Sequence, residues 1–291
     1  QTTLPYNGTY VLVIDSSNST AANFNFQVIT PTTTTSALTL NTPVSSTISK
    51  LGEQDIYTFT GTAGQQLYYD NLKTDTSDIF SAYLVSPSGT TIFNQQADSD
   101  YSFFTLTQTG TYQLIISSDT YYYGYPYDGD TGTYNFNLLN AGSSPVLPLG
   151  SAVTGTLTGG RETDIYRFTG TAGQRLQFDS TTATNGAYWS VYGPNGQRVG
   201  SYYNNSTDFT VNLPSNGEYY LVLEGYSNSN FSYSFQVNDI SDATVTPSGF
   251  GTTQTGTISA GQTATFNYTG NAGQFLFFDS LDVDYDSIQV E

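Results

Sequence analysis

Cysteine, methionine and histidine are all absent from the 291-residue sequence. Without cysteine no disulfide can form, so cystine pairing gives no information about the compartment. Without histidine there is no imidazole to act as a base, which excludes nucleophilic catalysis of the Ser–His or Cys–His type. Zinc sites built from Cys or His are excluded for the same reason. Cys and Met are the side chains most easily oxidised, and a chain that lacks both is suited to life outside the cell.

Basic residues are scarce: six Lys and Arg stand against 24 Asp and Glu, which gives a net charge of −18. Binding to phosphates needs clustered Lys or Arg, so we expect neither nucleic acid nor an anionic membrane surface as a partner. The same charge attracts divalent cations. No apolar run is long enough to span a bilayer, and no basic-then-apolar signal segment opens the sequence. We therefore expect no membrane insertion, and interpret the chain as a mature product or an internal piece of a longer one.

The sequence does contain an internal repeat. The block "DIYTFTGTAGQQLYYD" (55–70) returns at 164–179 and, as "ATFNYTGNAGQFLFFD", at 264–279. A second block, "TLTQTGTYQLII" (105–116), returns at 211–223, and the opening "TTLPYNGTYVLVI" (2–14) is its third copy. A closing apolar–polar alternation returns at 24–28, 134–138 and 233–237. This recurrence predicts copies of one structural unit of about a hundred residues.

The repeats define the expected domain organisation. Residues 42–140 and 150–239 are two complete modules, residues 1–30 are the C-terminal part of a module, and residues 252–291 are the N-terminal part of a further one. The segments 31–41, 141–149 and 240–251 are rich in Thr, Pro, Ser and Gly. We expect these three segments to be short, extended and weakly structured linkers.

Within a module the patterns are those of strands and turns. "IYTFTG", "QLYYD" and "TYQLIIS" alternate so that one side chain in two faces inward. "GTAGQ" connects two such runs, and the Pro-then-Gly turns "SPSGT" (86–90) and "GPNGQ" (193–197) connect two more. Several short strands at regular spacing predict an all-β fold of tandem antiparallel β-sandwich modules, jelly-roll-like, joined by short linkers.

The order of these blocks resembles the bacterial pre-peptidase C-terminal domain (PPC-like repeats). The residues that carry the resemblance are D-x-Y-x-F-x-G-x-A-G-Q at 55–65 and 164–174, the P-x-G turns at Pro87 and Pro194, and "GTYQL" at 110–114. The third copy departs from the pattern, with Ala264 and Phe266 in place of Asp and Tyr. The resemblance implies a compact β-sandwich, an accessory module of secreted and cell-surface bacterial proteins, some of which bind calcium or a matrix ligand. The family's peptidase chemistry lies in other domains.

Acidic side chains gather at the end of one repeated block, where they are candidates for binding Ca²⁺, a hard cation that takes oxygen ligands. The candidate ligands are Asp70, Asp75 and Asp78 in the first complete module and Asp279, Asp282, Asp284 and Asp286 in the last copy. On a strand Asp282, Asp284 and Asp286 share one face, where their repulsion favours a cation. The alternative is a solvated acidic turn. Asp70, Asp179 and Asp279 are equivalent, and each is either a shared ligand or a strand-end Asp that accepts hydrogen bonds from turn amides.

The segment "DTYYYGYPYDGDTGTY" (119–134) is an insertion relative to the other copies. Its tyrosines have an apolar face and a polar tip, which suits stacking on sugar rings or docking on a neighbouring module. The candidates are Tyr121, Tyr122, Tyr123, Tyr125 and Tyr127 for ligand binding or assembly, and Asp128 and Asp130 for a cation. The alternative is a long hairpin tip whose tyrosines lie on their own sheet.

Three functions are compatible with these features. The first is a non-catalytic, extracellular structural repeat protein that forms part of a surface fibre, sheath, layer or adhesin stalk and is stiffened by calcium. The second is a carbohydrate- or matrix-binding accessory module of a secreted bacterial enzyme. The third is a hydrolase that uses a pair of carboxylates, as glycosidases do. We favour the first.

The incomplete copies at the two ends have two interpretations. The chain is a window of a longer array, or the front half of one chain pairs with the back half of the next in a head-to-tail filament. The partners are then neighbouring modules or other copies of the chain. We favour the window, because the hairpin equivalent to residues 86–102 has no counterpart in either piece.

Overall fold

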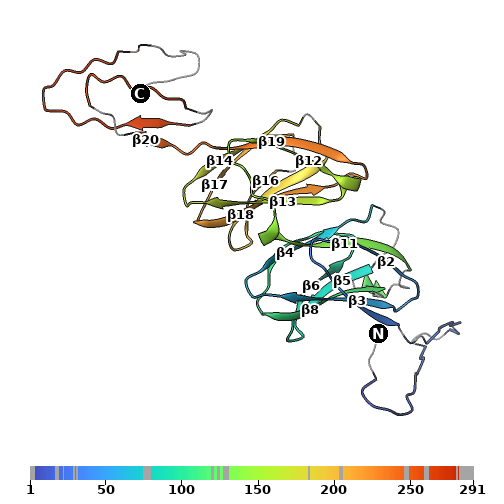
Figure 1. The fold of residues 1–291 in the computed structure, drawn as a ribbon. Coiled ribbons are helices and arrows are strands. Elements are labelled where there is room, and N and C mark those ends of the chain that lie inside the picture. Colours follow the sequence, from blue (N-terminus) through green and yellow to red (C-terminus); the bar gives the residue numbers. More distant parts are fainter. Residues whose placement is uncertain are drawn as a thin grey trace. The chain divides into compact units, whose positions relative to one another are not determined.

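The structure, a computed structural model, describes residues 4–16, 20–21, 23–28, 30, 32–74, 80–118, 121–122, 125–126, 131–182, 184–202, 206–245, 249–258, 262–279 and 281. The chain divides into two compact units, Gln1–Asp239 and Ile240–Glu291. The regular structure is almost entirely β, which confirms the predicted all-β fold (Figure 1). The helices of the described residues are two single 3₁₀ turns, η1 (Ala141–Ser143) and η2 (Thr158–Gly160). None of these residues forms a helix that is long and apolar enough to cross a membrane.

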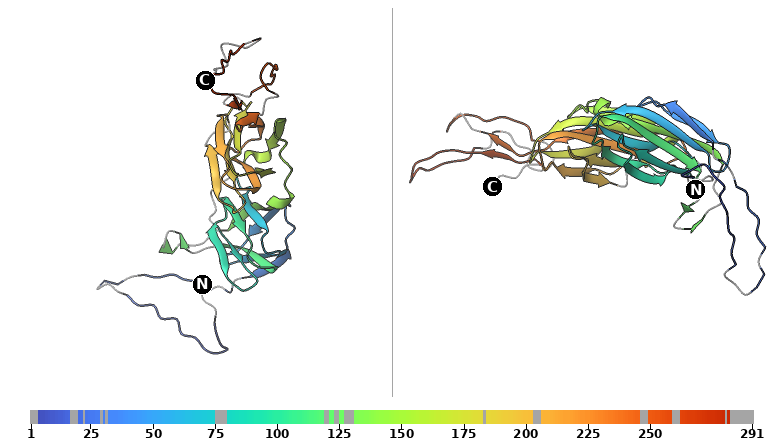
Figure 2. Two further views of the ribbon diagram at one scale, coloured as in Figure 1. Left: turned by 90° about the vertical axis from the view of Figure 1, so that its left-hand side faces the viewer. Right: turned by 90° about the horizontal axis from the view of Figure 1, so that it is seen from below.

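The first sandwich consists of two sheets that pack face to face (Figure 2). One has the strand order β1-β3-β8-β5-β6 and the other has the order β2-β11-β4-β7. The strands are β1 (Thr33–Ala37), β2 (Val44–Ile48), β3 (Gln54–Gly61), β4 (Gln66–Asn71), β5 (Phe80–Val85), β6 (Thr91–Gln96), β7 (Tyr101–Thr105), β8 (Gly110–Ser118) and β11 (Gly132–Asn140). A small separate hairpin is formed by β9 (Tyr121–Tyr122) and β10 (Tyr125–Pro126).

The second sandwich repeats this arrangement. Its sheets have the orders β13-β18-β15-β16 and β12-β19-β14-β17, which match the first sandwich strand for strand apart from β1. The strands are β12 (Ala152–Leu157), β13 (Thr163–Gly170), β14 (Arg175–Ser180), β15 (Ala187–Tyr192), β16 (Arg198–Tyr202), β17 (Phe209–Asn212), β18 (Gly217–Gly225) and β19 (Phe231–Asp239). Each sandwich encloses its own apolar core, and Trp189, the only Trp, is buried in the second.

The repeated motifs have matching local structures. Gly64 and Gly173 in the "GTAGQ" turns have φ of 88° and 83°, a region that residues with a Cβ avoid. Tyr112 and Tyr219 each donate a 2.7 Å hydrogen bond to a backbone carbonyl four residues upstream, so that each fixes the start of a long central strand. The same bond joins Tyr10 to the carbonyl of residue 6 at 2.6 Å. These contacts explain why the Gly and Tyr positions recur in the sequence.

The three segments expected as linkers are not free connections. Part of each segment pairs in parallel with the edge strand of the sheet that follows it in the sequence. β1 lies within 31–41 and pairs in parallel with β3, and the bridge Val146–Arg167 places 141–149 equivalently beside β13. In the second unit β20 (Ala243–Val245) pairs in parallel with β21 (Ala264–Phe266) in the register of β1 and β3. The Thr- and Pro-rich composition did not indicate pairing, but each segment satisfies an edge that would otherwise be open.

Residues 4–16 and 23–28, expected as strands of an incomplete module, have no assigned strand. Their large apolar side chains are exposed, as are several near the end of the chain. The exposed side chains include Val11, Val13, Phe24 and Val28 in the first segment and Phe275, Phe277 and Phe278 in the second.

Candidate functional site

The two sandwiches meet through the outer faces of two sheets, β2-β11-β4-β7 of the first and β13-β18-β15-β16 of the second. Strand β4 shows this directly, because five consecutive residues from Leu67 to Asn71 are buried. One side of the strand faces its own core, so the other side must be covered by a neighbour. We call this neighbouring surface the inter-sandwich contact. Its buried residues are Tyr68, Phe103, Ala141, Ile165, Tyr192, Tyr220 and Val222, with Leu139 packed against them.

Aromatic rings form the centre of the inter-sandwich contact. The ring of Phe103 lies 4.8 Å from that of Tyr192 and 5.1 Å from that of Tyr220, with the second pair stacked. Tyr68 approaches the same ring edge-on at 5.7 Å. Aromatic pairs at these separations contribute about 0.5–1.5 kcal/mol each beyond the area that they bury. The contact therefore has the packing of a protein core.

Hydrogen bonds between the sandwiches surround these rings. Gln66 Nε2 donates to the carbonyl of Pro194 at 2.9 Å, and Ser102 Oγ donates to the hydroxyl of Tyr192 at 3.0 Å. The Tyr68 hydroxyl donates to Glu224 Oε2 at 3.1 Å. Such bonds depend on orientation, so they fix one sandwich against the other where apolar packing alone would allow sliding.

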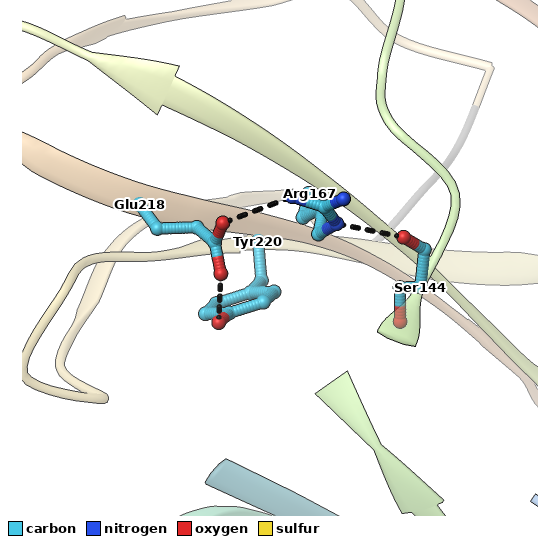
Figure 3. A network of polar contacts seen from close by, with 4 residues as sticks. All are labelled: Ser144, Arg167, Glu218 and Tyr220. Atoms are coloured by element: carbon cyan, nitrogen blue, oxygen red, sulfur yellow. Dashed lines mark hydrogen bonds and ion pairs between the residues drawn. The ribbon is translucent and has the colours of Figure 1, made fainter. Parts of the chain in front are cut away.

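The segment that joins the sandwiches is held in place by Arg167 (Figure 3). Its Nε donates to the carbonyl of Ser144 at 3.0 Å, and its Nη1 forms an ion pair with Glu218 at 3.2 Å. Glu218 also accepts a 2.6 Å hydrogen bond from Tyr220. Burial and this carboxylate raise the pKa of the Tyr220 hydroxyl. Both members of the ion pair are about one third exposed, so its contribution is at most about 1 kcal/mol. Its main effect is to position the joining segment.

Carboxyl groups from both sandwiches lie around Tyr68. Burial raises the pKa of Asp70 well above its usual range, and the nearby Asp100 raises it further. Burial and Glu224 raise the pKa of Asp100 to about 8, although its side chain accepts a 2.6 Å hydrogen bond from the amide of Asn71. Burial likewise raises the pKa of Glu224. The contact thus favours protonated carboxyl groups or an added positive charge.

The structure describes two of the predicted metal ligands, Asp70 and Asp279. Asp70 is fully buried in β4, whereas Asp279 is exposed in the second unit. The remaining predicted acidic ligands lie outside the described residues: Asp75, Asp78, Asp128, Asp130, Asp282, Asp284 and Asp286. Within the described part of the chain, no group of three or more acidic residues is placed to hold a metal ion.

The predicted tyrosine site is described only in part. Tyr121 and Tyr122 form β9 and Tyr125 belongs to β10, and the structure describes their backbone. Tyr123 and Tyr127 lie outside the described residues.

Sequence reasoning missed Tyr68, Phe103, Tyr220 and Glu224. A signal was present, because "LYY" (67–69) in β4 and "YYLVL" (219–223) in β18 are continuously apolar or aromatic where a half-exposed strand alternates. The equivalent "RLQFDS" of the second sandwich does alternate. The position of Asp100 against Glu224 carries no such signal, because it depends on which module faces which.

No family model matches the chain, and a search of curated proteins gave no match either. Among solved structures, it is similar to the pre-peptidase C-terminal domain of a collagenase from Bacillus anthracis, with 20% identity over 33% of this chain and 94% of that one and a TM-score of 0.28. PliG, a periplasmic inhibitor of g-type lysozyme from Aeromonas hydrophila, matches at 21% identity over 32% and 94% with a TM-score of 0.28. The secreted serine protease VesC from Vibrio cholerae matches at 11% identity over 70% and 48% with a TM-score of 0.25.

Proposed function

We propose that the chain is a non-catalytic structural segment of an extracellular or cell-surface protein, in which like sandwiches dock to form a stiff spacer. The observation that carries the proposal is the inter-sandwich contact, which buries aromatic side chains such as Phe103 from one sandwich against Tyr220 from the next. Successive domains move relative to each other unless a large apolar interface holds them together. The buried rings form such an interface, so they support a fixed arrangement of the two sandwiches.

The joining segment supports the same function. It continues directly from β11 into η1 and the Val146–Arg167 bridge, so little free chain separates the two sandwiches. The partners in this proposal are other sandwiches of the same kind, in the same chain or in a neighbouring copy. The absence of cysteine, methionine and histidine and the net charge of −18 fit an exposed, oxidising environment without nucleic-acid partners.

Electron microscopy with a gold-labelled antibody against residues 42–239 tests this function in the source cells. The proposal predicts label in surface fibres, sheaths or layers that project from the cell. Label confined to the cell interior would contradict it. A soluble secreted enzyme that carries the label, with no assembled material, would favour the accessory-module alternative.

A further inference from the structure

A cavity of about 290 Å³ lies between the two sandwiches, next to the inter-sandwich contact. Asp70, Asn137 and Thr163 line it, and so do the carboxyl-bearing residues Glu162 and Asp164. Among the described residues, five buried side-chain polar atoms have no hydrogen-bond partner. Three of these five belong to this one cavity: Asp70 Oδ1, Asn137 Oδ1 and Thr163 Oγ1. The Thr163 side chain lies near the Asp70 carboxylate, but no hydrogen bond of normal geometry joins their unpaired oxygens. Buried polar atoms are nearly always satisfied, so three oxygens without a partner in one place indicate an absent ligand.

Both sandwiches place these oxygens. Asp70 and Asn137 are directly opposite each other on β4 and β11, so their side chains project from the same face of the sheet. Thr163 begins β13 of the second sandwich, and its amide donates a 3.3 Å hydrogen bond to Asp70 Oδ2. Asp70 is 0% exposed and Thr163 is 4% exposed. The unpaired oxygens are therefore held by strands rather than by loose loops.

The chemistry of these atoms selects the ligand. A carboxylate, an amide carbonyl and a hydroxyl are the oxygen donors that hard cations take, and no nitrogen or sulfur donor is available in a chain without His and Cys. Ca²⁺ accepts six to eight oxygens in irregular geometry and completes its shell with water, whereas Mg²⁺ demands a near-octahedral shell. The surroundings are negative, because Glu162 and Asp164 border the same space.

We propose that this cavity binds one Ca²⁺ ion through Asp70 Oδ1, Asn137 Oδ1 and Thr163 Oγ1, and that the ion links the two sandwiches. The site differs from the acidic clusters expected from the sequence, because it uses one carboxylate with two neutral oxygens from separate strands. The site goes beyond the proposed spacer function and does not depend on it.

The chain offers a matched control for the test. Asp179 is the equivalent of Asp70 in the second sandwich, but it is partly exposed and has no third sandwich packed on it within the same unit. Asp70→Asn and Asp179→Asn each remove one charge at the same point of the repeat. Thr163→Val removes only a hydroxyl, at nearly constant shape.

The test is calorimetric titration of the complete chain with Ca²⁺, with circular dichroism to show that each variant is folded. We expect a dissociation constant of about 10⁻⁴–10⁻³ M, as in extracellular Ca²⁺ modules. Asp70→Asn should lower the number of bound ions by one relative to Asp179→Asn. Thr163→Val should weaken the same site on the order of tenfold.

Counting ions relative to the control removes the contribution of any other acidic segment. Equal stoichiometry and affinity in Asp70→Asn and Asp179→Asn would overturn the proposal, and so would an unchanged Ca²⁺ affinity in Thr163→Val. These results would mean that the cavity holds water or that Asp70 simply keeps its proton. They would leave the spacer function intact, because the aromatic contact and the surface location are measured separately.

Discussion

The two sandwiches have the same strand order and the same turns, yet their outward faces differ. On the first, the β2-β11-β4-β7 sheet presents Tyr68, Phe103 and Leu139 to the second sandwich. At the equivalent outward positions, the second sandwich has Gln177, Thr210 and Asn238, none of which is buried. The inward-facing residues of the strands thus form the core of both sandwiches, whereas the outward-facing residues determine whether a sheet packs against a neighbouring sandwich.

Truncating the centre of the inter-sandwich contact should give the largest effect. Phe103→Ala should destabilise the chain by about 3 kcal/mol, because it removes a buried ring and leaves a cavity between Tyr192 and Tyr220. The matched change Thr210→Ala on the exposed face should stay within about 0.5 kcal/mol. Urea unfolding measures both. Equal effects would show that the outward faces are equivalent after all.

A polar network that occurs once in each core provides the second test. In the first sandwich the hydroxyls of Tyr57 and Tyr134 are hydrogen-bonded at 2.7 Å, and the Tyr134 hydroxyl donates to Asp55 at 2.5 Å. In the second sandwich Asp164, Tyr166 and Tyr233 form the equivalent hydrogen bonds. At the aligned positions of the terminal pieces the sequence has Ala264, Phe266 and Phe24, so the whole network is replaced by apolar residues.

Tyr134→Phe should therefore cost about 1–3 kcal/mol, because it leaves the buried Asp55 with one donor fewer. The triple change Asp55→Ala, Tyr57→Phe and Tyr134→Phe should cost less than the single change, since no buried charge remains. Thermal unfolding of the two variants is the measurement. A triple variant less stable than Tyr134→Phe would contradict the interpretation.

The carboxyl groups at the contact predict a pH dependence of intermediate size. Because the pKa of Asp100 is about 8 in the folded chain and about 4 in an unfolded one, folding takes up a proton between these values. The resulting stabilisation is complete below about pH 4 and is lost as the pH rises through about 8. With EDTA present to remove bound cations, the free energy of unfolding should therefore fall as the pH rises from about 4 to about 8.

Asp100→Asn should flatten that pH dependence. Asp208, its exposed equivalent in the second sandwich, accepts the same kind of hydrogen bond, from the amide of Ser180 at 2.8 Å. Asp208→Asn should leave the slope unchanged. Denaturant unfolding at a series of pH values provides the comparison, and an unaltered slope in Asp100→Asn would assign the effect to other groups.

The smallest effect is expected at the repeated turn. Gln65 Oε1 accepts a hydrogen bond from the amide of Thr62 at 3.1 Å, and Gln174 and Gln274 make the same contact in the other copies. Gln65→Ala should cost about 1 kcal/mol, because it removes one exposed, local contact. Gln174→Ala should cost somewhat more, because Gln174 Nε2 also donates a 2.7 Å hydrogen bond to Asp239. Thermal unfolding of the two variants is the measurement; a larger shift in Gln65→Ala would contradict this interpretation of the turns.

The all-β sandwich fold was predictable from the sequence because alternation, turn glycines and the repeated Tyr of "GTYQL" are local signals. The parallel edge segments were not predictable, since pairing of β1 with β3 depends on backbone geometry that Thr and Ser do not specify. Of the candidate ligands, Asp70 alone is described as buried, and its oxygen partners come from strands distant in sequence. The consecutive apolar and aromatic residues of β4 and β18 were the signals of the contact.

The distance between the two sandwiches in solution tests the central claim most directly. The chain has no cysteine, so Thr62→Cys and Thr171→Cys, at equivalent exposed turns, allow specific spin labelling. If the sandwiches are docked, pulsed electron paramagnetic resonance will give one narrow distance distribution, which Phe103→Ala will broaden and Thr210→Ala will not. A broad distribution in the unaltered chain would contradict the docked arrangement.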